Sequence, residues 1–358
     1  MTDNIILKNE GSALPRSLRL SDKVYLAPSP NLEEGGVEIA LRSQAGDVQF
    51  FKSDLAEVIG WGDSLPDHLS SISKQASGLQ RFWDSRTEPS QLPKIMGIVN
   101  VTPDSFSDGG SYFDPSNAIT HAEELVEAGA DILDIGGEST RPGADRVEDI
   151  EELARVKPVV EGCKSLGKLI SIDTRKSVVM EGAIEAGAGL INDVTALDYD
   201  PRSLQIAATS NLPVCLMHSS ADPKVMQKHT DYRHVLFDVI DYLSDRVETC
   251  VAAGITRDRL IPDPGIGFGK VLDQNLALLK GLRYFHALGG DVLLGASRKT
   301  FIGKLDREAP ATERTTGSVL CAVQGAVSGV QIVRVHDVAE TRQGLAVWRA
   351  IEKSPLTV

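Results

Sequence analysis

The chain has 358 residues, of which 42% are hydrophobic and 24% are charged, proportions that are ordinary for a globular enzyme. A formal net charge of -13, from 37 basic and 50 acidic residues, argues against nucleic-acid binding, because phosphate backbones are bound by clustered lysine and arginine. The four cysteines form no CxxC pair, no apolar run is long enough for a membrane span, and the first residues carry no signal-peptide pattern. We therefore expect a cytoplasmic protein with no nucleic-acid or membrane partner.

Residues 1–93 are predicted to form a small N-terminal α+β extension of unknown role that ends in a linker. The expected elements are three short strands and one helix, at 23–28, 37–43, 47–53 and 66–83. The stretch SRTEPSQLP (85–93) has the composition of the linker.

Residues 94–358 repeat a unit in which a short run rich in Val, Ile and Leu precedes an amphipathic helical stretch. The runs barely alternate in polarity, as is typical of strands covered on both faces. The eight predicted strands are IMGIVNV (95–101), DILDIGG (131–137), LISIDT (169–174), LINDV (190–194), PVCLMH (213–218), LIPDPG (260–265), DVLLGAS (291–297) and VQIVRVHDV (330–338). Eight such units predict a (β/α)8 TIM barrel, with a doubly wound open sheet as the alternative.

Polar residues mark the C-terminal ends of these strands. They are Asn100, Asp134, Glu138, Asp173, Asn192, His218, Asp263, Ser297, Arg334 and His336. In a barrel these ends converge on the face where chemistry takes place, whereas in an open sheet they would spread along an edge. The pattern therefore favours the barrel and locates its functional site.

The stretch DPGIGFGK (263–270) superficially looks like a phosphate-binding loop. Its glycines do not fit the P-loop spacing, and Lys270 stands where the dinucleotide fingerprint requires its third glycine. Glycine allows a backbone to approach a ligand closely, although a plain turn explains this stretch equally well when it is considered alone.

Seven motifs in this order resemble those of the dihydropteroate synthase family, the sulfonamide target of folate synthesis. They are NVTPDSFSDGG (100–110), GGESTRPGA (136–144), SIDTRK (171–176), LINDV (190–194), DPGIGFGK (263–270), ASRK (296–299) and IVRVHDV (332–338). The resemblance implies a transferase that condenses 6-hydroxymethyl-7,8-dihydropterin diphosphate with 4-aminobenzoate, giving 7,8-dihydropteroate and diphosphate. It further implies an SN1-like step, diphosphate departure assisted by Mg²⁺, and a homodimer.

The resemblance also assigns residues to each part of the site. The implied pterin-binding residues are Asp173, Asn192, Met217, Asp263, Gly267, Phe268 and Lys299. The implied diphosphate-binding residues are Asn100, Thr140, Arg141, Arg334 and His336, with Asn100 also the ligand of Mg²⁺. The implied aminobenzoate-binding residues are Phe106, Thr140, Pro142, Ser297 and Thr300. The implied catalytic residues are Asn100, Asp104, Lys299, Arg334 and His336.

Two of these assignments have a physical basis in the residues themselves. A buried carboxylate such as Asp263 can accept two hydrogen bonds from the guanidine-like edge of a pterin. Arg334 and His336 alternate on the last strand, so both should lie on one side and could bind an anion. The alternative for this pair is a surface ion-pair network with Asp337 and Glu340.

The fifth strand departs from the family pattern, because His218 is followed by Ser219 and Ser220 where Gln and Gly are usual. We expect His218 to make a hydrogen bond at the barrel rim, and the contribution of the two serines stays open. Three other functions compete with the synthase: a methyltetrahydrofolate-binding barrel of the corrinoid methyltransferase type, a Schiff-base aldolase using Lys299, and a non-catalytic pterin-binding or assembly protein.

Overall fold

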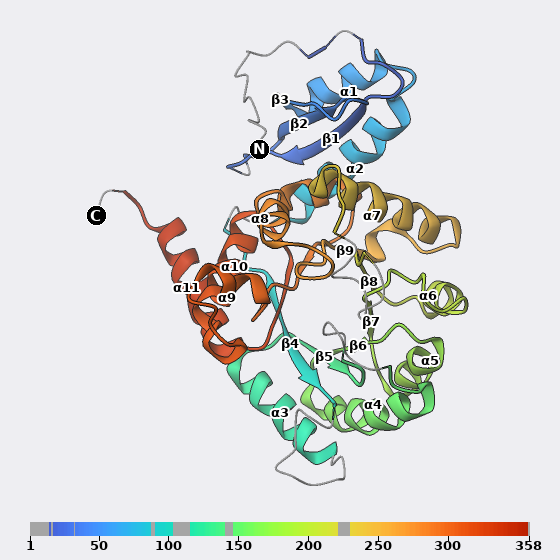
Figure 1. Cartoon of the computed structure of the whole chain (residues 1–358), viewed down its shortest axis with the longest axis vertical. Coiled ribbons are helices and arrows are strands. Elements are labelled where there is room, and N and C mark those ends of the chain that lie inside the picture. The colour runs from blue at the N-terminus through green and yellow to red at the C-terminus, as the bar shows by residue number, and fades with distance from the viewer. Residues whose placement is uncertain are drawn as a thin grey trace.

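A computed structural model of the chain describes residues 14–356 except for 16, 32, 87–89, 103–114, 140–145 and 221–229. Figure 1 shows a ring of strands surrounded by helices, with the N-terminal unit packed on one side of the ring. None of the helices in these described ranges has the length and apolarity needed to cross a membrane.

Within the described residues, the ring consists of eight parallel strands: β4 (Lys94–Asn100), β5 (Ile132–Gly136), β6 (Leu169–Asp173), β7 (Leu190–Asp193), β8 (Val214–Met217), β9 (Leu260–Asp263), β10 (Leu293–Leu294) and β11 (Ile332–Val335). Their hydrogen-bonded order is β10-β11-β4-β5-β6-β7-β8-β9, so β9 and β10 meet at the seam that nearly closes the barrel. Asn100, Gly136, Asp173 and Asn192 are successive partners across four strands, which brings the C-terminal ends to one level. The predicted (β/α)8 barrel is confirmed.

In the described part of the barrel, nine helices pack outside or between these strands: α3 (Pro115–Ala128), α4 (Asp149–Cys163), α5 (Ser177–Ala186), α6 (Ser203–Ser210), α7 (Val235–Ala252), α8 (Leu272–Lys280), α9 (Thr300–Leu305), α10 (Thr315–Val327) and α11 (Val338–Lys353). A short 3-10 helix, η5 (Leu282–Leu288), lies between α8 and β10. The barrel interior holds an apolar cluster contributed by seven of the eight strands: Met96, Ile132, Leu190, Cys215, Ile261, Leu293 and Ile332. This cluster fills the barrel and leaves the strand ends to the polar residues.

The N-terminal unit contains β1 (Lys23–Pro28), β2 (Gly36–Arg42), β3 (Val48–Asp54), α1 (Leu55–Asp63) and α2 (Leu69–Ser85). The three expected strands form an antiparallel sheet in the order β1-β2-β3, and the expected helix is α2. Helix α1 is an addition to the predicted elements. It begins directly after β3, where the Asp54 side chain accepts a hydrogen bond from the Glu57 amide at 2.8 Å and so caps the helix.

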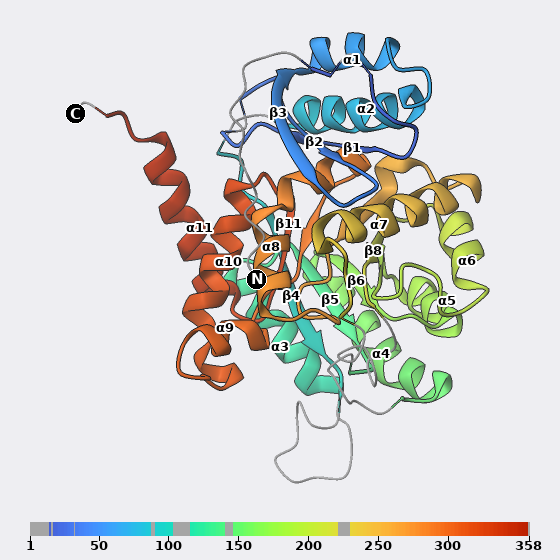
Figure 2. The same cartoon turned by 45° about the horizontal axis from the view of Figure 1, so that its top comes forward.

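This unit has a hydrophobic core of its own, and it also packs tightly against the barrel. In Figures 1 and 2 it lies over α7, and α2 and β1 also contact η5. At Gly78 the backbone of α2 comes so close that an added Cβ would lie 2.5 Å from the Ala287 carbonyl oxygen. Ala287 itself belongs to the core of the N-terminal unit.

Substitution of Gly78 tests this close approach. We expect Gly78→Ala to lower the free energy of unfolding by about 1–3 kcal/mol, because the methyl group has no room against rigid backbone. Gly60 on α1 is the matched control, since a Cβ there meets no atom within 4 Å. Gly60→Ala should raise the free energy of unfolding by about 0.5–1 kcal/mol through helix propensity. Denaturant titration measures both values, and equal effects of the two substitutions would contradict the packing.

Candidate active site

A network of charged side chains lies inside the barrel at the C-terminal ends of β5, β6, β7 and β11. Arg334 donates from Nε to Asp134 Oδ2 at 2.6 Å and from Nη2 to Asp173 Oδ2 at 2.7 Å. The Asn192 amide donates to both oxygens of Asp134, at 3.2 and 3.3 Å. The structure thus brings together three residues predicted for the site, Asp173, Asn192 and Arg334.

Asp134 is the member of this network to which sequence reasoning assigned no role, although it is fully buried. Burying a carboxylate within an apolar strand costs free energy unless a cation or hydrogen-bond donors compensate the charge. The presence of Asp134 in such a strand was therefore the signal in the sequence that it has a buried partner. Burial would lower the pKa of Arg334, but Asp134 and Asp173 together raise it above the ordinary arginine value. Burial raises the pKa of Asp173, and the charge of Arg334 opposes that rise.

Asp263 ends β9 and holds the first turn of the glycine-rich stretch. Its Oδ1 accepts a hydrogen bond from the Gly265 amide at 2.7 Å. Gly265, Gly267 and Gly269 all have positive φ values, of 67°, 85° and 64°, and a Cβ on Gly265 would lie 1.9 Å from the His218 carbonyl oxygen. The stretch therefore needs glycine both for its backbone conformation and for the approach of β8. Burial raises the pKa of Asp263 to about 6, and the Gly265 amide opposes this rise.

Lys270 closes the stretch and points into it. It is 4% exposed, and its ammonium group donates to the carbonyl oxygens of Gly265 and Phe268 at 2.9 Å and of His218 at 3.2 Å. Sequence reasoning assigned no role to this lysine, which fixes the backbone of the stretch. His218 Nδ1 is 3.0 Å from the same Nζ, in keeping with the expected rim hydrogen bond. Burial and Lys270 lower the pKa of His218 to about 2, so its ring is neutral.

Met217, Phe268 and Lys299, three further residues predicted for the pterin site, lie beside Asp263. Met217 and Phe268 form a small apolar cluster with Val194. The Lys299 ammonium lies 4.0 Å from the centroid of the Phe268 ring, a cation–π contact. A Cβ on Gly267 would lie 2.9 Å from Lys299 Cδ, so glycine makes room for this side chain.

His336 and Ser297 form a pair between β11 and the segment after β10. Ser297 Oγ is 2.9 Å from His336 Nδ1 and accepts a hydrogen bond from the His336 amide at 3.2 Å. Burial, followed by the charge of Arg334, lowers the pKa of His336 to about 3. Asp337 pairs with Arg298, whose Nε lies 3.0 Å from Asp337 Oδ2. Asp337 thus binds Arg298, whereas Arg334 binds Asp134 and Asp173 inside the barrel. The alternative of a surface ion-pair network between Arg334 and Asp337 is therefore wrong.

The remaining predicted residues lie at the rim or beyond the described ranges. Asn100 ends β4 and is half-buried, and Thr300 is the exposed first residue of α9. Five predicted residues fall outside the described residues: Asp104, Phe106, Thr140, Arg141 and Pro142. The described residues contain no group of three or more His, Cys, Asp or Glu side chains that could hold a metal ion. A hydrated Mg²⁺ that binds the amide oxygen of Asn100 and a substrate phosphate does not require such a group.

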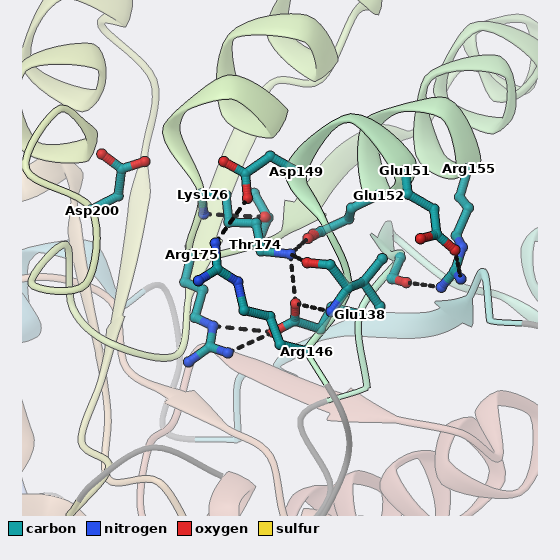
Figure 3. A network of polar contacts seen from close by, with 12 residues as sticks. Glu138, Arg146, Asp149, Glu151, Glu152, Arg155, Thr174, Arg175, Lys176 and Asp200 are labelled. Atoms are coloured by element: carbon teal, nitrogen blue, oxygen red, sulfur yellow. Dashed lines mark hydrogen bonds and ion pairs between the residues drawn. The ribbon is translucent and has the colours of Figure 1, made fainter. Parts of the chain in front are cut away.

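A second network, shown in Figure 3, joins the ends of β5 and β6 to α4. Glu138 binds Arg175 Nη2 at 2.8 Å and Lys176 Nζ at 2.5 Å, and Lys176 also lies 2.6 Å from Glu152 Oε2. The Lys176 ammonium donates in addition to the Val147 carbonyl at 2.5 Å. The sequence pattern placed Glu138 at a strand end but did not identify these partners. The network fixes the chain where it enters α4.

The fold and these clusters define a (β/α)8 barrel whose polar side chains gather at the C-terminal ends of its strands. The family model for pterin binding enzymes matches residues 96–336. The dihydropteroate synthase of Neisseria meningitidis serogroup B is 50% identical over 264 residues, which cover 72% of this chain and 93% of that protein. The dihydropteroate synthase of Escherichia coli K12 is 46% identical over 259 residues, covering 72% and 91%.

Solved structures agree with this relationship. The Xanthomonas albilineans dihydropteroate synthase with 4-aminobenzoic acid has a TM-score of 0.70 and 45% identity, covering 74% of this chain and 95% of that chain. The same enzyme in complex with 7,8-dihydropteroate has a TM-score of 0.67 and 43% identity, covering 74% and 96%. The chain therefore belongs to the dihydropteroate synthase family of pterin-binding enzymes, which are transferases of folate synthesis. This assignment displaces the methyltetrahydrofolate-binding barrel and the aldolase.

Proposed function

We propose that the protein condenses 6-hydroxymethyl-7,8-dihydropterin diphosphate with 4-aminobenzoate to form 7,8-dihydropteroate and diphosphate. The observation that carries this proposal is the convergence, on one face of the barrel, of seven side chains or backbone positions suited to a pterin. They are Asp173, Asn192, Met217, Asp263, Gly267, Phe268 and Lys299. Carboxylates and an amide meet the polar edge of the ring, and the apolar residues meet its flat face.

Asp263 is the residue that grips the guanidine-like edge of the pterin in this proposal. One of its oxygens already accepts from the Gly265 amide, which fixes the carboxylate in place. An ionised carboxylate has further acceptor sites on both oxygens for the ring N–H and the exocyclic amino group. Lys299 donates to the carbonyl region of the ring.

The reaction needs no protein nucleophile. The bond between the pterin methylene carbon and the diphosphate oxygen breaks first, and the electron pair leaves with diphosphate. The resulting cation is delocalised into the pterin ring, and the amine of 4-aminobenzoate then attacks the carbon and releases a proton. The protein contributes orientation and electrostatic stabilisation to this SN1-like sequence. Asp104 is assigned to proton handling.

The diphosphate is assigned to Arg334 and His336, with Asn100, Thr140 and Arg141. Asp134 and Asp173 use Nε and Nη2 of Arg334, so the guanidinium can still offer Nη1 to a phosphate oxygen. Asn100 would hold Mg²⁺, which neutralises charge on the departing diphosphate when it is bound. The carboxylate and ring of 4-aminobenzoate are assigned to Ser297, Thr300, Phe106, Thr140 and Pro142.

A direct assay tests the whole reaction. The protein should release diphosphate from 6-hydroxymethyl-7,8-dihydropterin diphosphate only when 4-aminobenzoate and Mg²⁺ are both present. A chelator should abolish this release and added Mg²⁺ should restore it. A sulfonamide should inhibit in competition with 4-aminobenzoate. A protein that binds the pterin but never releases diphosphate would be the non-catalytic alternative.

Replacing Asp263 tests the pterin grip through its pH dependence. Since the pKa of Asp263 is raised to about 6, the carboxylate that binds pterin is lost as the pH falls through that value. Wild-type pterin affinity should fall by up to about tenfold per pH unit below 6. Asp263→Asn presents an amide donor to ring donors, which costs about 1–3 kcal/mol, so its affinity at pH 7.5 should be weaker by about five- to 150-fold. The pterin affinity of Asp263→Asn should also no longer show the fall below pH 6 that protonation of Asp263 causes in the wild type. Calorimetry at pH 7.5 and pH 5 measures both effects.

The stability of the same variant separates binding from folding. A carboxyl whose folded pKa is raised stabilises the folded state below its unfolded value, and this contribution is lost as the pH rises through about 6. At pH 7.5 the free Asp263→Asn protein should therefore be at least as stable as the wild type. A large loss of stability, or an unchanged pterin affinity, would count against the assignment.

We also propose that the protein acts in the cytoplasm as a homodimer through α10 and α11. Four large apolar side chains of these adjacent helices are exposed: Leu320, Val327, Val347 and Ile351, at 69%, 41%, 55% and 66%. Figure 1 shows both helices on the outer side of the barrel. An exposed apolar face on two adjacent helices suits a two-fold contact with a second copy. Light scattering should give a dimer for the wild type and a monomer for Leu320→Glu, and an unaltered mass for this variant would place any contact elsewhere.

A further inference from the structure

The N-terminal unit is tied to both ends of α7 by ion pairs of different character. At the start of the helix, Arg42 of β2 binds Asp238 at 2.6 Å and Asp241 at 2.5 Å, and its side chain is only 11% exposed. At the other end, Lys74 of α2 binds Glu248 at 2.7 Å, with side chains that are 50% and 38% exposed. The first contact is buried and doubly paired, whereas the second is a surface pair of small energetic value.

Arg42 is further held by aromatic rings. Its guanidinium lies 5.3 Å from the centroid of Tyr25 and 5.8 Å from that of Phe237. The two rings stack on each other with their centroids 4.2 Å apart. The Tyr25 hydroxyl donates to Asp241 at 3.1 Å. The arginine is thus fixed by charge, by hydrogen bonds and by stacking at the same time.

Asp238 connects Arg42 to the backbone at the beginning of α7. Its Oδ2 accepts a hydrogen bond from the His234 amide at 2.9 Å, while its Oδ1 binds Arg42. The carboxylate that fixes the entry of the chain into the helix is therefore oriented by the N-terminal unit. The neighbouring Arg233 makes a second link, since its Nη2 donates to the Gln44 carbonyl at 2.6 Å in the turn between β2 and β3.

Tyr232 precedes these residues and reaches the glycine-rich stretch. Its hydroxyl donates to the Gly269 carbonyl at 3.1 Å, and its ring lies 5.9 Å from the His218 ring. Ser220, whose contribution the sequence left open, hydrogen-bonds the same hydroxyl. Burial raises the pKa of this tyrosine to about 12, so it is a donor at neutral pH. Gly269 lies one residue after Phe268, a wall of the candidate pterin site.

We propose that the N-terminal unit positions the pterin site, with Arg42 and Tyr232 as positioning residues. Arg42 fixes the start of α7 through Asp238, and the segment that leads into the helix then holds Tyr232 against Gly269. The identity of the ligand rests on the proposed function, whereas the mechanical link rests on these contacts alone. The family match covers residues 96–336, so Arg42 lies outside it whereas Tyr232 lies within it.

The experiment compares four full-length proteins: the wild type, Arg42→Met, Tyr232→Phe and Lys74→Met. Calorimetry with 6-hydroxymethyl-7,8-dihydropterin gives the pterin Kd of each protein. Steady-state kinetics at saturating pterin diphosphate give the Michaelis constant for the aminobenzoate substrate. Arg42→Met and Tyr232→Phe should each raise the pterin Kd by roughly three- to tenfold, in the range found for coupling through intermediate residues. Neither should change the Michaelis constant for aminobenzoate.

Lys74→Met is the matched control, because it also removes an ion pair between the N-terminal unit and α7 but at the end distant from Asp238. It should leave the pterin Kd unchanged. Equal Kd values for all four proteins, or an equal rise in Lys74→Met, would mean that the N-terminal unit contributes only stability. If Arg42→Met does not fold, Arg233→Met takes its place, since it removes the second link between the N-terminal unit and the start of α7. A wild type that fails to bind the pterin contradicts the proposed function instead.

Discussion

Arg334 lies inside the barrel with its guanidinium between the carboxylates of Asp134 and Asp173, and the arrangement of the strand ends depends on this contact. Taking a charge out of water costs several kcal/mol unless partners of good geometry replace the solvent. Here β11 supplies the cation, β5 and β6 supply the anions, and Asn192 of β7 completes the donors to Asp134. These contacts hold the C-terminal ends of β5, β6, β7 and β11 at the same height in the barrel, although β4 separates β11 from β5. The same groups line the candidate pterin site, so in the proposed function one set of side chains serves both structure and binding.

The glycine-rich stretch (263–270) meets a different requirement in the proposed function. Its backbone must come close to a flat ligand, and that backbone must stay fixed. Glycine permits the positive φ values, but glycine alone would leave the stretch loose. Lys270 provides the missing constraint by donating to three carbonyl oxygens from a buried position. Burial lowers its pKa to about 7, which reflects the cost of placing an ammonium there. A lysine at the end of a glycine run usually suggests phosphate binding, and here its donors are already used by the protein itself.

The sequence predicted the barrel because its strands are short Val, Ile and Leu runs that end in polar residues, and the observed strands lie within the predicted ranges or within a residue or two of them. It missed α1 because this helix follows β3 without an intervening turn and contains two glycines, Gly60 and Gly62. The side chains of the site could be named one by one, but their pairing could not. Arg334 and Asp134 are separated by 200 residues, and only the closure of the barrel shows that they meet. The sequence assigned no role to Lys270 or Asp134, because their roles consist entirely of such contacts.

The N-terminal unit lies beside the part of the barrel that most needs support. The hydrogen-bonded strand order is interrupted between β9 and β10, and η5, which connects the preceding helix α8 to β10, is covered by α2 and β1. Asp263 ends β9, and Lys299 follows β10, so two residues of the candidate pterin site flank this seam. The relatives match over 93% and 91% of their own length while covering 72% of this chain, so the family barrel does not depend on such a unit for its chemistry. What the unit can add is rigidity at the seam and at the start of α7, and both lie next to the glycine-rich stretch of the candidate pterin site.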